Sequence, residues 1–468
     1  MNTRQTLRLL RDYESRNVLF TEPDGSWPIV WERAKGVHVW DAEGKKYLDL
    51  TAAFGVAAAG HANAAVVRAG RKQMGTLLHA MGDVHPHPLK AELARELSRV
   101  TFGRWASGIG HRASGIRTKA SGKTIFCNSG FEAVEAALKT AFLATGKARV
   151  IAFEGGYHGL GYGALNTTHR SHFRDPFRRQ LREFADFVPF PEQVGPAALR
   201  LGAESQRDSA HVESVSSDEA SSAFKRVEAA LVKLLKRGET GAVLVEPMQA
   251  RGGIRIPPPA FLQMLRRRCD DFGALLIVDE IYTGFGRTGR MFGCEYSGVV
   301  PDLICLGKAL TGGFPMSACV GRADVMDRAW PASNGEAIHT STFLGHPVGC
   351  AMALAQLKEL KRLKLSERSA KLGKVLLAEL GRLSSKTLSL QVRGSGLMAG
   401  LELSHTAGSP ATAESICIIK RLLQDGFIFL PEGEHANVIG FTPPLTISES
   451  DLRRSVNALA NALRTVDT

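Results

Sequence analysis

Short apolar runs alternate with helical patterns through the middle of the chain. The runs have the length and composition of buried strands, and they fall at residues 124–127, 150–153, 242–245, 275–278, 303–306 and 317–320. Between them, apolar residues recur at helical spacing, as at Val134, Leu138 and Ala141. Such alternation is typical of a mostly parallel sheet with helices on both faces, so it predicts an α/β fold.

The two ends of the chain show other patterns. Residues 4–16 predict a helix or arm, and residues 37–50 alternate around Gly44 as a hairpin does. A further helix is expected at 88–100. After His346 a long helical pattern precedes three strand-like runs, at 392–403, 427–430 and 437–441. These runs indicate a smaller α+β domain.

These patterns divide the chain into three parts. We expect an amino-terminal arm with a segment of the small domain at 1–75, the large domain at 76–345, and the carboxy-terminal small domain at 346–468. Two polar stretches without periodicity, 103–123 and 191–217, are predicted to be surface insertions without a site of their own.

Composition places the chain among ordinary globular proteins. Of its 468 residues 44% are hydrophobic and 22% charged, and no apolar run is long enough to span a bilayer. Residues 1–17 are charged and lack the apolar core of a signal peptide, so a cytoplasmic location is expected. The seven cysteines are scattered without Cys-x-x-Cys spacing, which predicts small buried hydrophobes and neither disulfides nor a metal site.

A net charge of +13 makes nucleic-acid binding a possible interpretation. The basic residues are nevertheless spread along the chain, with no dominant cluster and little aromatic interleaving. An enzyme that handles an anionic cofactor and substrate explains the charge as well, and we favour it, with neither nucleic acid nor membrane as a partner.

Chemistry-bearing residues follow two of the expected strands. Asp279 comes directly after the run 275–278, and Lys308 follows the run 303–306. In α/β sheets ligands bind beyond the carboxyl ends of the strands, so both side chains can face one cavity. A lysine can form a Schiff base with an aldehyde, and an aspartate can hold a pyridinium nitrogen protonated, a pair that suits pyridoxal phosphate. Each residue alone is more often an ordinary cap or loop charge.

Other strand ends add candidate groups to the same edge. Asn128, Ser129 and Gly130 precede a helix whose amino terminus can bind a phosphate, although plain helix capping explains them equally well. Tyr157 lies among glycines after the run 150–153, where its ring can stack on a flat ligand. Glu246 follows the run 242–245.

Seven motifs in this order resemble the class III aminotransferases, pyridoxal-phosphate enzymes of fold type I that include the ω-amino acid, ornithine and amine aminotransferases. The resemblance runs from about Val37 to the end of the chain. The motifs are NSGFEAVEAALK from Asn128, YHG at Tyr157, EPMQ at Glu246, VDEIYTGFGRTG at Val278, LGKALTGGFPMSA at Leu306, HTSTFLGHP from His339 and VRGSGLMAGLEL from Val392.

The resemblance implies a large domain with a mostly parallel, seven-stranded type of sheet, and a smaller domain formed by both ends of the chain. It also implies a role for each matched residue. Lys308 forms the Schiff base and moves the proton, while Asp279 pairs with the pyridine nitrogen. Tyr157 and Ile281 pack on the two ring faces, and Glu246 supports the hydrogen-bond network. The phosphate is held by Ser129, Gly130 and Phe131, with Thr342 from the neighbouring subunit of a homodimer.

The chain departs from the family pattern at residues that bear on substrate. Tyr282 stands where many members have a Gln that reaches the phenolic oxygen of the cofactor. Gly440 stands where several members carry a carboxylate-binding Arg, and Arg251 stands where those members have its partner Glu. A bare glycine is expected to leave a hole. Either Arg251 supplies a relocated guanidinium or the site takes an amine without an α-carboxylate, and a solvent-facing Arg251 is an equally good alternative. Arg251 is therefore a candidate substrate residue, with Phe54 from the small-residue loop 51–60 as a second.

The leading prediction is an aminotransferase that moves an amino group from an amine or ω-amino acid to an oxo acid or aldehyde in two half-reactions. A racemase or epimerase on the same scaffold is the alternative within enzymes, and a catalytically silent cofactor-binding protein is the alternative outside them. The sequence does not name the donor, the acceptor or the stereochemistry.

Overall fold

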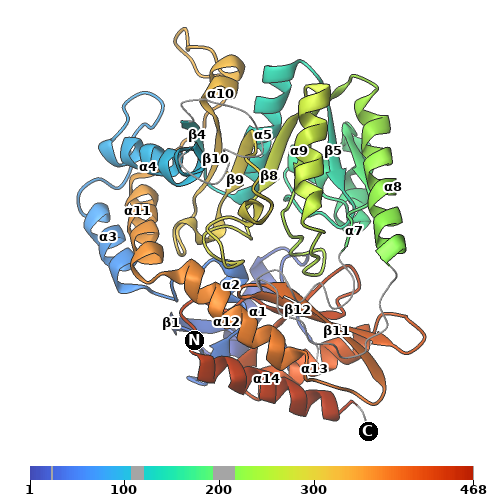
Figure 1. Ribbon diagram of the computed structural model, residues 1–468. Helices are drawn as coiled ribbons and strands as arrows, with labels where there is room; N and C mark the ends of the chain where they lie inside the picture. Colours follow the sequence, from blue (N-terminus) through green and yellow to red (C-terminus); the bar gives the residue numbers. More distant parts are fainter. Residues whose placement is uncertain (23–24, 107–120, 193–216, 467–468) are drawn as a thin grey trace.

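A computed structural model describes residues 1–22, 25–106, 121–192 and 217–466 (Figure 1). At its centre is a seven-stranded sheet. Its strands are β4 (Gly122–Cys127), β5 (Arg149–Phe153), β6 (Ala185–Val188), β7 (Thr240–Val245), β8 (Leu275–Asp279), β9 (Leu303–Leu306) and β10 (Ser317–Arg322). Their order is β4-β10-β9-β8-β7-β5-β6, and β10 alone runs antiparallel to its neighbours. The expected α/β fold with a mostly parallel seven-stranded sheet is confirmed.

Helices cover both faces of this sheet, as its strand sequences require. Every residue of β7, β8 and β9 is buried, which suits strands covered on two sides. On one face α5 (Gly130–Thr145) packs Val134 and Leu138 against alternate strand residues such as Ile277 and Cys305. The helices on the other face are α4 (Pro88–Ser98), α8 (Ser217–Leu235) and α9 (Ala260–Phe272).

A second layer lies below the large sheet in Figure 1 and combines both ends of the chain. One of its sheets has the order β1-β2-β3-β13, so a carboxy-terminal strand pairs with an amino-terminal one. The other has the order β11-β12-β15-β14. The strands are β1 (Trp31–Lys35), β2 (His38–Asp41), β3 (Lys46–Asp49), β11 (Leu388–Ser395), β12 (Met398–His405), β13 (Phe427–Ile428), β14 (Leu430–Glu432) and β15 (Val438–Phe441). The domain bounds 1–75, 76–345 and 346–468 remain a prediction.

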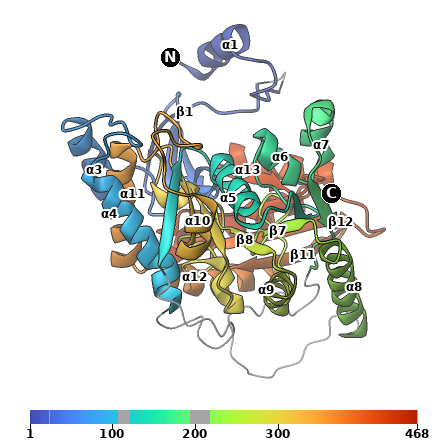
Figure 2. The same ribbon diagram turned by 90° about the horizontal axis from the view of Figure 1, so that it is seen from above.

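The remaining helices lie either beside the large sheet or on the second layer and its junction with the first. They are α2 (Ala52–Gly55), α3 (Ala64–Met74), α6 (Tyr162–Thr167), α7 (Ser171–Arg174), α10 (Ala323–Ala329), α11 (Pro347–Arg362), α12 (Leu365–Leu380), α13 (Thr412–Gln424) and α14 (Glu449–Arg464). The helix α1 (Thr3–Tyr13) buries none of its residues and stands apart from the body of the molecule in Figure 2. Thr3 nevertheless ties its start to Glu43 through the backbone N–H, at 2.8 Å.

Several sequence-based boundaries are wrong. The run 392–403 is two antiparallel strands, β11 and β12, because Gly396 turns the chain at a φ of 57°. Any side chain at Gly396 would overlap the backbone of Thr288, where the nearest atom lies 2.3 Å from an added Cβ. The helix expected at 88–100 ends at Ser98 and continues as a π-helical turn, and β1 and β6 were not anticipated.

The two predicted insertions fall mainly on residues 107–120 and 193–216, which lie outside the described residues. Of the seven cysteines, six are buried and Cys417 is exposed. Within the described part of the chain, no helix combines the length and apolar character needed to cross a bilayer. Those same residues include no cluster of three or more His, Cys, Asp or Glu side chains that could hold a metal ion.

Candidate active site

Lys308 lies just past the carboxyl end of β9, where a short 3-10 turn begins (Lys308–Leu310). Its φ of 37° is in the left-handed region, which a non-glycine residue adopts only when its surroundings hold it there. Burial lowers the pKa of the Lys308 ammonium, which increases the fraction of neutral amine at a given pH. Its Nζ lies 4.4 Å from the centroid of the Tyr282 ring.

Asp279 ends the neighbouring strand β8 and is 4% exposed. It pairs with Cys305 in the β8–β9 register, so Lys308 follows only three residues beyond that pair on the adjacent strand. One carboxylate oxygen, Oδ1, accepts the N–H of Ile281 at 3.0 Å. The other, Oδ2, lies 2.8 Å from Nδ1 of His158.

His158 is a site residue that sequence reasoning missed. Its side chain is 1% exposed, and its contact with Asp279 joins residues 121 positions apart. The backbone N–H of His158 also donates to Thr168 Oγ1 at 2.9 Å. Its position in the YHG motif, next to Tyr157, was the one sequence feature that could have indicated His158 as a site residue.

The start of α5 leaves one buried hydroxyl beside the amino terminus of a helix. Ser129 is the N-cap residue, and its buried Oγ has no hydrogen-bond partner among the described residues. Gly130 is packed against Ile281, because a Cβ at Gly130 would lie 3.1 Å from Ile281 Cδ1. Phe131 follows on the exposed side. An orphaned hydroxyl at a helix amino terminus is chemistry that suits an anion.

Tyr157 and Glu246 are joined at the ends of β5 and β7. The N–H of Tyr157 donates to Glu246 Oε1 at 3.0 Å, and that of Ala250 donates to Oε2 at 3.1 Å. Burial raises the pKa of Glu246 to about 7. The ring of Tyr157 meets Phe173 edge to face, with centroids 5.5 Å apart. Glu246 therefore fixes the backbone of Tyr157 and the start of the loop that carries Arg251.

Tyr282 turns its ring toward Lys308 and its hydroxyl away from it. The Tyr282 hydroxyl lies 3.3 Å from Thr442 Oγ1, which in turn donates to the carbonyl of Thr51. Burial raises the pKa of Tyr282 well above its ordinary value, so the phenol stays protonated. The ring face beneath the Lys308 amine gives a cation–π contact that favours the ammonium form and partly offsets the effect of burial.

Arg251 does not face solvent alone, and Gly440 does not border a hole. Arg251 Nη1 donates to Glu432 Oε2 at 3.0 Å, and the two side chains are 30% and 4% exposed. Glu432 fills the space beside Gly440, because a Cβ at Gly440 would lie 3.1 Å from Glu432 Cγ. Burial raises the pKa of Glu432 to about 7, against the opposing effect of Arg251. Both expectations, the hole and the solvent-facing arginine, are therefore wrong.

The last two candidate residues are exposed. Phe54, in α2, is 49% exposed and has a φ of 59°. Its neighbour Gly55 packs against the Tyr282 ring, because a Cβ at Gly55 would lie 3.0 Å from Tyr282 Cε1. Thr342 is exposed in the segment before α11, and its neighbour Ser341 accepts a hydrogen bond from Asn128 Nδ2 at 3.5 Å.

A family model described as "Aminotransferase class-III" matches residues 20–463. This chain belongs to that family. The acetylornithine aminotransferase of Methanopyrus kandleri is 35% identical over 94% of this chain and 95% of its own length. The 5-aminovalerate aminotransferase of Pseudomonas aeruginosa is 34% identical over 92% and 93%.

Solved structures give the same picture. The ornithine aminotransferase of Toxoplasma gondii has a TM-score of 0.80 at 25% identity and covers 100% of this chain and 96% of its own. An aminotransferase of Bacillus anthracis has a TM-score of 0.83 at 26% identity, with coverage of 99% and 100%. The chain is a pyridoxal-phosphate-dependent aminotransferase, and none of these comparisons favours the racemase alternative. The partly buried Lys308, the Asp279–His158 pair and the orphaned Ser129 hydroxyl fit that cofactor.

Proposed function

We propose that this aminotransferase uses Lys308 and Asp279 as its catalytic residues and takes an ω-amino acid as amino donor, with Arg251 binding the substrate carboxylate. The observation that supports it best is the convergence of Lys308, Asp279 and the start of α5 at one edge of the large sheet. When bound, pyridoxal phosphate supplies an aldehyde that receives the amino group and a pyridinium ring that withdraws electrons.

The residues of the chain divide the remaining work. Ser129, Gly130 and Phe131 would hold the phosphate, and Ile281 and Tyr157 would confine the ring. Asp279 would keep the ring nitrogen protonated, with its carboxylate held by His158 at 2.8 Å. Burial lowers the pKa of Lys308 and so increases the fraction of neutral amine, and Lys308 Nζ would remove a proton from the substrate carbon that bears nitrogen and deliver it back during transfer.

Arg251 supports an acidic substrate because its positive charge acts on Lys308 and because its own ion-pair partner, Glu432, is an acid with a raised pKa. Near pH 7 Glu432 is only partly ionised, since its pKa is about 7. A fully ionised substrate carboxylate can therefore compete for Arg251. Two relatives are named for acetylornithine and 5-aminovalerate, which carry a carboxylate remote from the reacting amine. An oxo acid is the proposed acceptor.

The experiment compares Arg251→Gln with Arg149→Gln, a matched loss of charge from an arginine at the start of β5 that pairs with Asp186 at 2.7 Å. Arg251→Gln is expected to raise the KM for an ω-amino acid about 10- to 100-fold, the value of one charge-assisted hydrogen bond, and to leave the KM for a simple alkylamine unchanged. Equal KM values for the ω-amino acid in Arg251→Gln and the wild type would refute the carboxylate assignment.

We further propose that the active enzyme is a homodimer in which Thr342 completes the phosphate site of the partner subunit. Two segments with exposed apolar side chains, residues 74–84 and 338–343, support a subunit interface. A hydrogen bond from Thr340 Oγ1 to Asp83 Oδ2 joins these segments at 2.5 Å. Their exposed side chains are Met74, Leu78, Met81, Val84, Ile338 and Phe343. Exposed apolar surface of this kind marks protein interfaces.

Mixed dimers test this sharing. Lys308→Ala and Thr342→Asp subunits are each expected to be nearly inactive, the second because its carboxylate repels the phosphate. If Thr342 serves the partner subunit, a mixed dimer contains one intact site and activity returns. If each Thr342 serves its own chain, no mixture regains activity, and sedimentation as a monomer would equally exclude the shared site.

A further inference from the structure

Arg251 sits near the tip of a closed loop, residues 249–255. The loop is closed by two backbone hydrogen bonds between Gln249 and Arg255, at 3.0 and 2.9 Å. Near its end, Gly253 and Ile254 have φ angles of 108° and 55°. The conformation of Ile254 is strained and persists only where surrounding contacts hold it.

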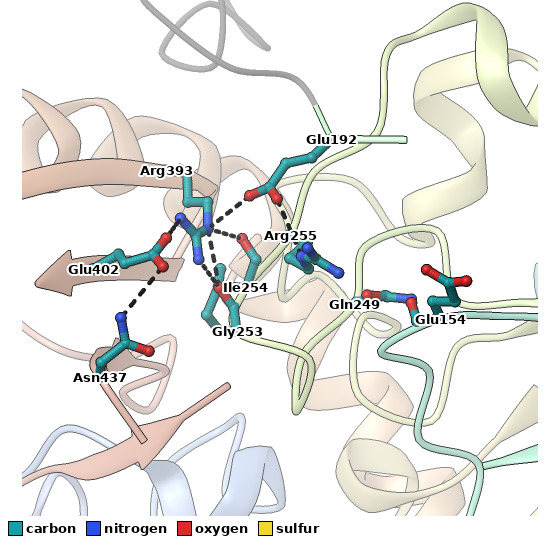
Figure 3. A network of polar contacts seen from close by, with 9 residues as sticks. All are labelled: Glu154, Glu192, Gln249, Gly253, Ile254, Arg255, Arg393, Glu402 and Asn437. Carbon is teal, nitrogen blue, oxygen red and sulfur yellow. Dashed lines mark hydrogen bonds and ion pairs between the residues drawn. The ribbon is translucent and has the colours of Figure 1, made fainter. Parts of the chain in front are cut away.

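The N–H groups of Gly253 and Ile254 both donate to the carbonyl of Ala250 at 3.0 Å, and the carbonyl groups of the two residues are held by one arginine on the opposite layer. Arg393, on β11, is 3% exposed, and its Nε lies 3.0 Å from the carbonyl oxygens of both Gly253 and Ile254. Its Nη2 donates to the carbonyl of Gly253 at 2.7 Å. Figure 3 shows the guanidinium fitted against the two carbonyl groups. Both carbonyls would lose these donors if Arg393 were removed.

Arg393 is itself held in place from two sides. Its Nη1 forms an ion pair with Glu402 on β12, which also accepts a hydrogen bond from Asn437 Nδ2 at 3.3 Å. Its Nε lies 3.4 Å from Glu192 Oε1, and the other oxygen of Glu192 accepts from Arg255 (Figure 3). The guanidinium therefore keeps a fixed plane, which suits a group that aligns two carbonyls at once.

The sheet that carries Arg393 also carries the ion-pair partner of Arg251. Glu432 is on β14, which belongs with β11 to the sheet of order β11-β12-β15-β14. The loop tip is further fixed by Gly433, whose N–H donates to the carbonyl of Arg251 at 3.2 Å. The loop 249–255 and the ion-pair partner Glu432 are therefore held by the same sheet.

We propose that Arg393 is a positioning residue for substrate recognition: by holding the Gly253 and Ile254 carbonyls it sets the place of the Arg251 guanidinium. The inference rests on the proposed role of Arg251 and extends it to a residue that contacts neither substrate nor cofactor. Loss of this support displaces Arg251, and displacements of about 1 Å can cost up to 100-fold in a positioned contact.

The experiment uses the cofactor-loaded Arg393→Lys enzyme. An ammonium keeps the charge but cannot reach both carbonyls and Glu402 in one plane. The KM for an ω-amino acid is expected to rise about tenfold, with kcat, the KM for a simple alkylamine and the visible absorption of the bound cofactor unchanged. The matched control is Arg266→Lys, a buried arginine that pairs with Asp302 before β9, at the opposite end of that strand from Lys308.

A double-mutant cycle separates this inference from the proposed function. If Arg393 acts through Arg251, the Arg393→Lys effect on KM disappears in the Arg251→Gln background. Retention of the full effect in that background, or an equal rise for the alkylamine, overturns the positioning role while Arg251 remains the anchor. If Arg251→Gln itself leaves KM unchanged, the proposed substrate contact fails instead.

A second variant tests the loop if Arg393→Lys does not fold. Gly253→Ala strains the same turn from the backbone side, because its φ is 108° and its Cβ would lie 3.3 Å from Gly433 Cα, next to Arg393 Nη2 at 3.4 Å. It should reproduce the selective rise in KM for the ω-amino acid. A KM for the ω-amino acid equal to that of the wild type would overturn the positioning role of this contact.

Discussion

The proposed cofactor side, Lys308 and Asp279, and the proposed substrate side, Arg251 and Glu432, are built from different parts of the fold. Lys308 and Asp279 occupy adjacent ends of two parallel strands, and β-sheet register fixes their separation. Arg251 and Glu432 come from a loop and from a strand of another sheet, 181 positions apart. Geometry on the first side follows from one sheet, whereas on the second side it depends on how two layers pack.

This difference predicts different responses to substitution. Changes on the cofactor side should alter all substrates alike, because the cofactor takes part in every turnover. Changes on the substrate side should alter one class of substrate and spare another.

The largest effect is expected for Lys308→Ala. Removal of the amine that moves the proton should lower kcat on the order of a thousandfold for every donor. Stopped-flow measurement of each half-reaction checks this, with Lys364→Ala, a surface lysine with a positive φ, as control. A loss confined to acidic donors would contradict the assignment.

His158→Gln should lower kcat about tenfold for all donors, because Asp279 loses an orienting partner in a buried site. Asp279 remains present, so cofactor should still bind. The measurement is the pH profile of kcat for an ω-amino acid and for an alkylamine. A fall in kcat for only one of the two donors would contradict the proposal that His158 acts on the cofactor-binding Asp279.

Glu432→Gln should change the pH dependence of KM, and only for substrates that carry a carboxylate. In the wild type, Glu432 ionises as pH rises through about 7 and then competes with the substrate for Arg251, so the KM for an ω-amino acid should rise above that pH. The variant should lose this rise, and Glu434→Gln, which removes an exposed acid nearby, should keep it. An unchanged profile in Glu432→Gln would contradict the competition.

The same group makes a prediction about stability. The folded-state pKa of Glu432 is raised from 4.5 to about 7, so the folded chain binds the extra proton between those values. Its contribution is present below pH 4.5 and is lost as pH rises through 7. Denaturant unfolding of Glu432→Gln should therefore depend less on pH in this window than unfolding of the wild type does.

The smallest effect is expected for Gly440→Ala. The added Cβ would lie 3.1 Å from Glu432 Cγ, and a shift of a few tenths of an ångström relieves the contact. A change of KM for the ω-amino acid within about threefold and a stability loss of about 1 kcal/mol are expected. A tenfold change in this KM would mean that the Glu432 side chain cannot shift by the few tenths of an ångström that relieve the contact.

The cofactor side could be anticipated from sequence because periodicity locates strand ends and parallel strands align those ends at one edge. Lys308, Asp279 and Ser129 all follow such runs. His158 was missed because its contact with Asp279 depends on the path of the loop after β5. No local pattern specifies that path.

The substrate side could not be anticipated in the same way. The run 427–430 looked like one strand, yet it divides between β13 and β14, which belong to different sheets. That division brings Glu432 to Arg251 and fills the space beside Gly440. Single-residue patterns at Arg251 and Gly440 indicated an altered site but not the acid that completes it.

The most direct test of the central claim is to reduce the cofactor-loaded enzyme with borohydride, digest it, and map the attached cofactor by mass spectrometry. Convergence of Lys308 and Asp279 on one cofactor predicts that the added mass is on the peptide containing Lys308, and that Lys308→Ala carries none. Attachment to another lysine, or none in the wild type, would contradict it.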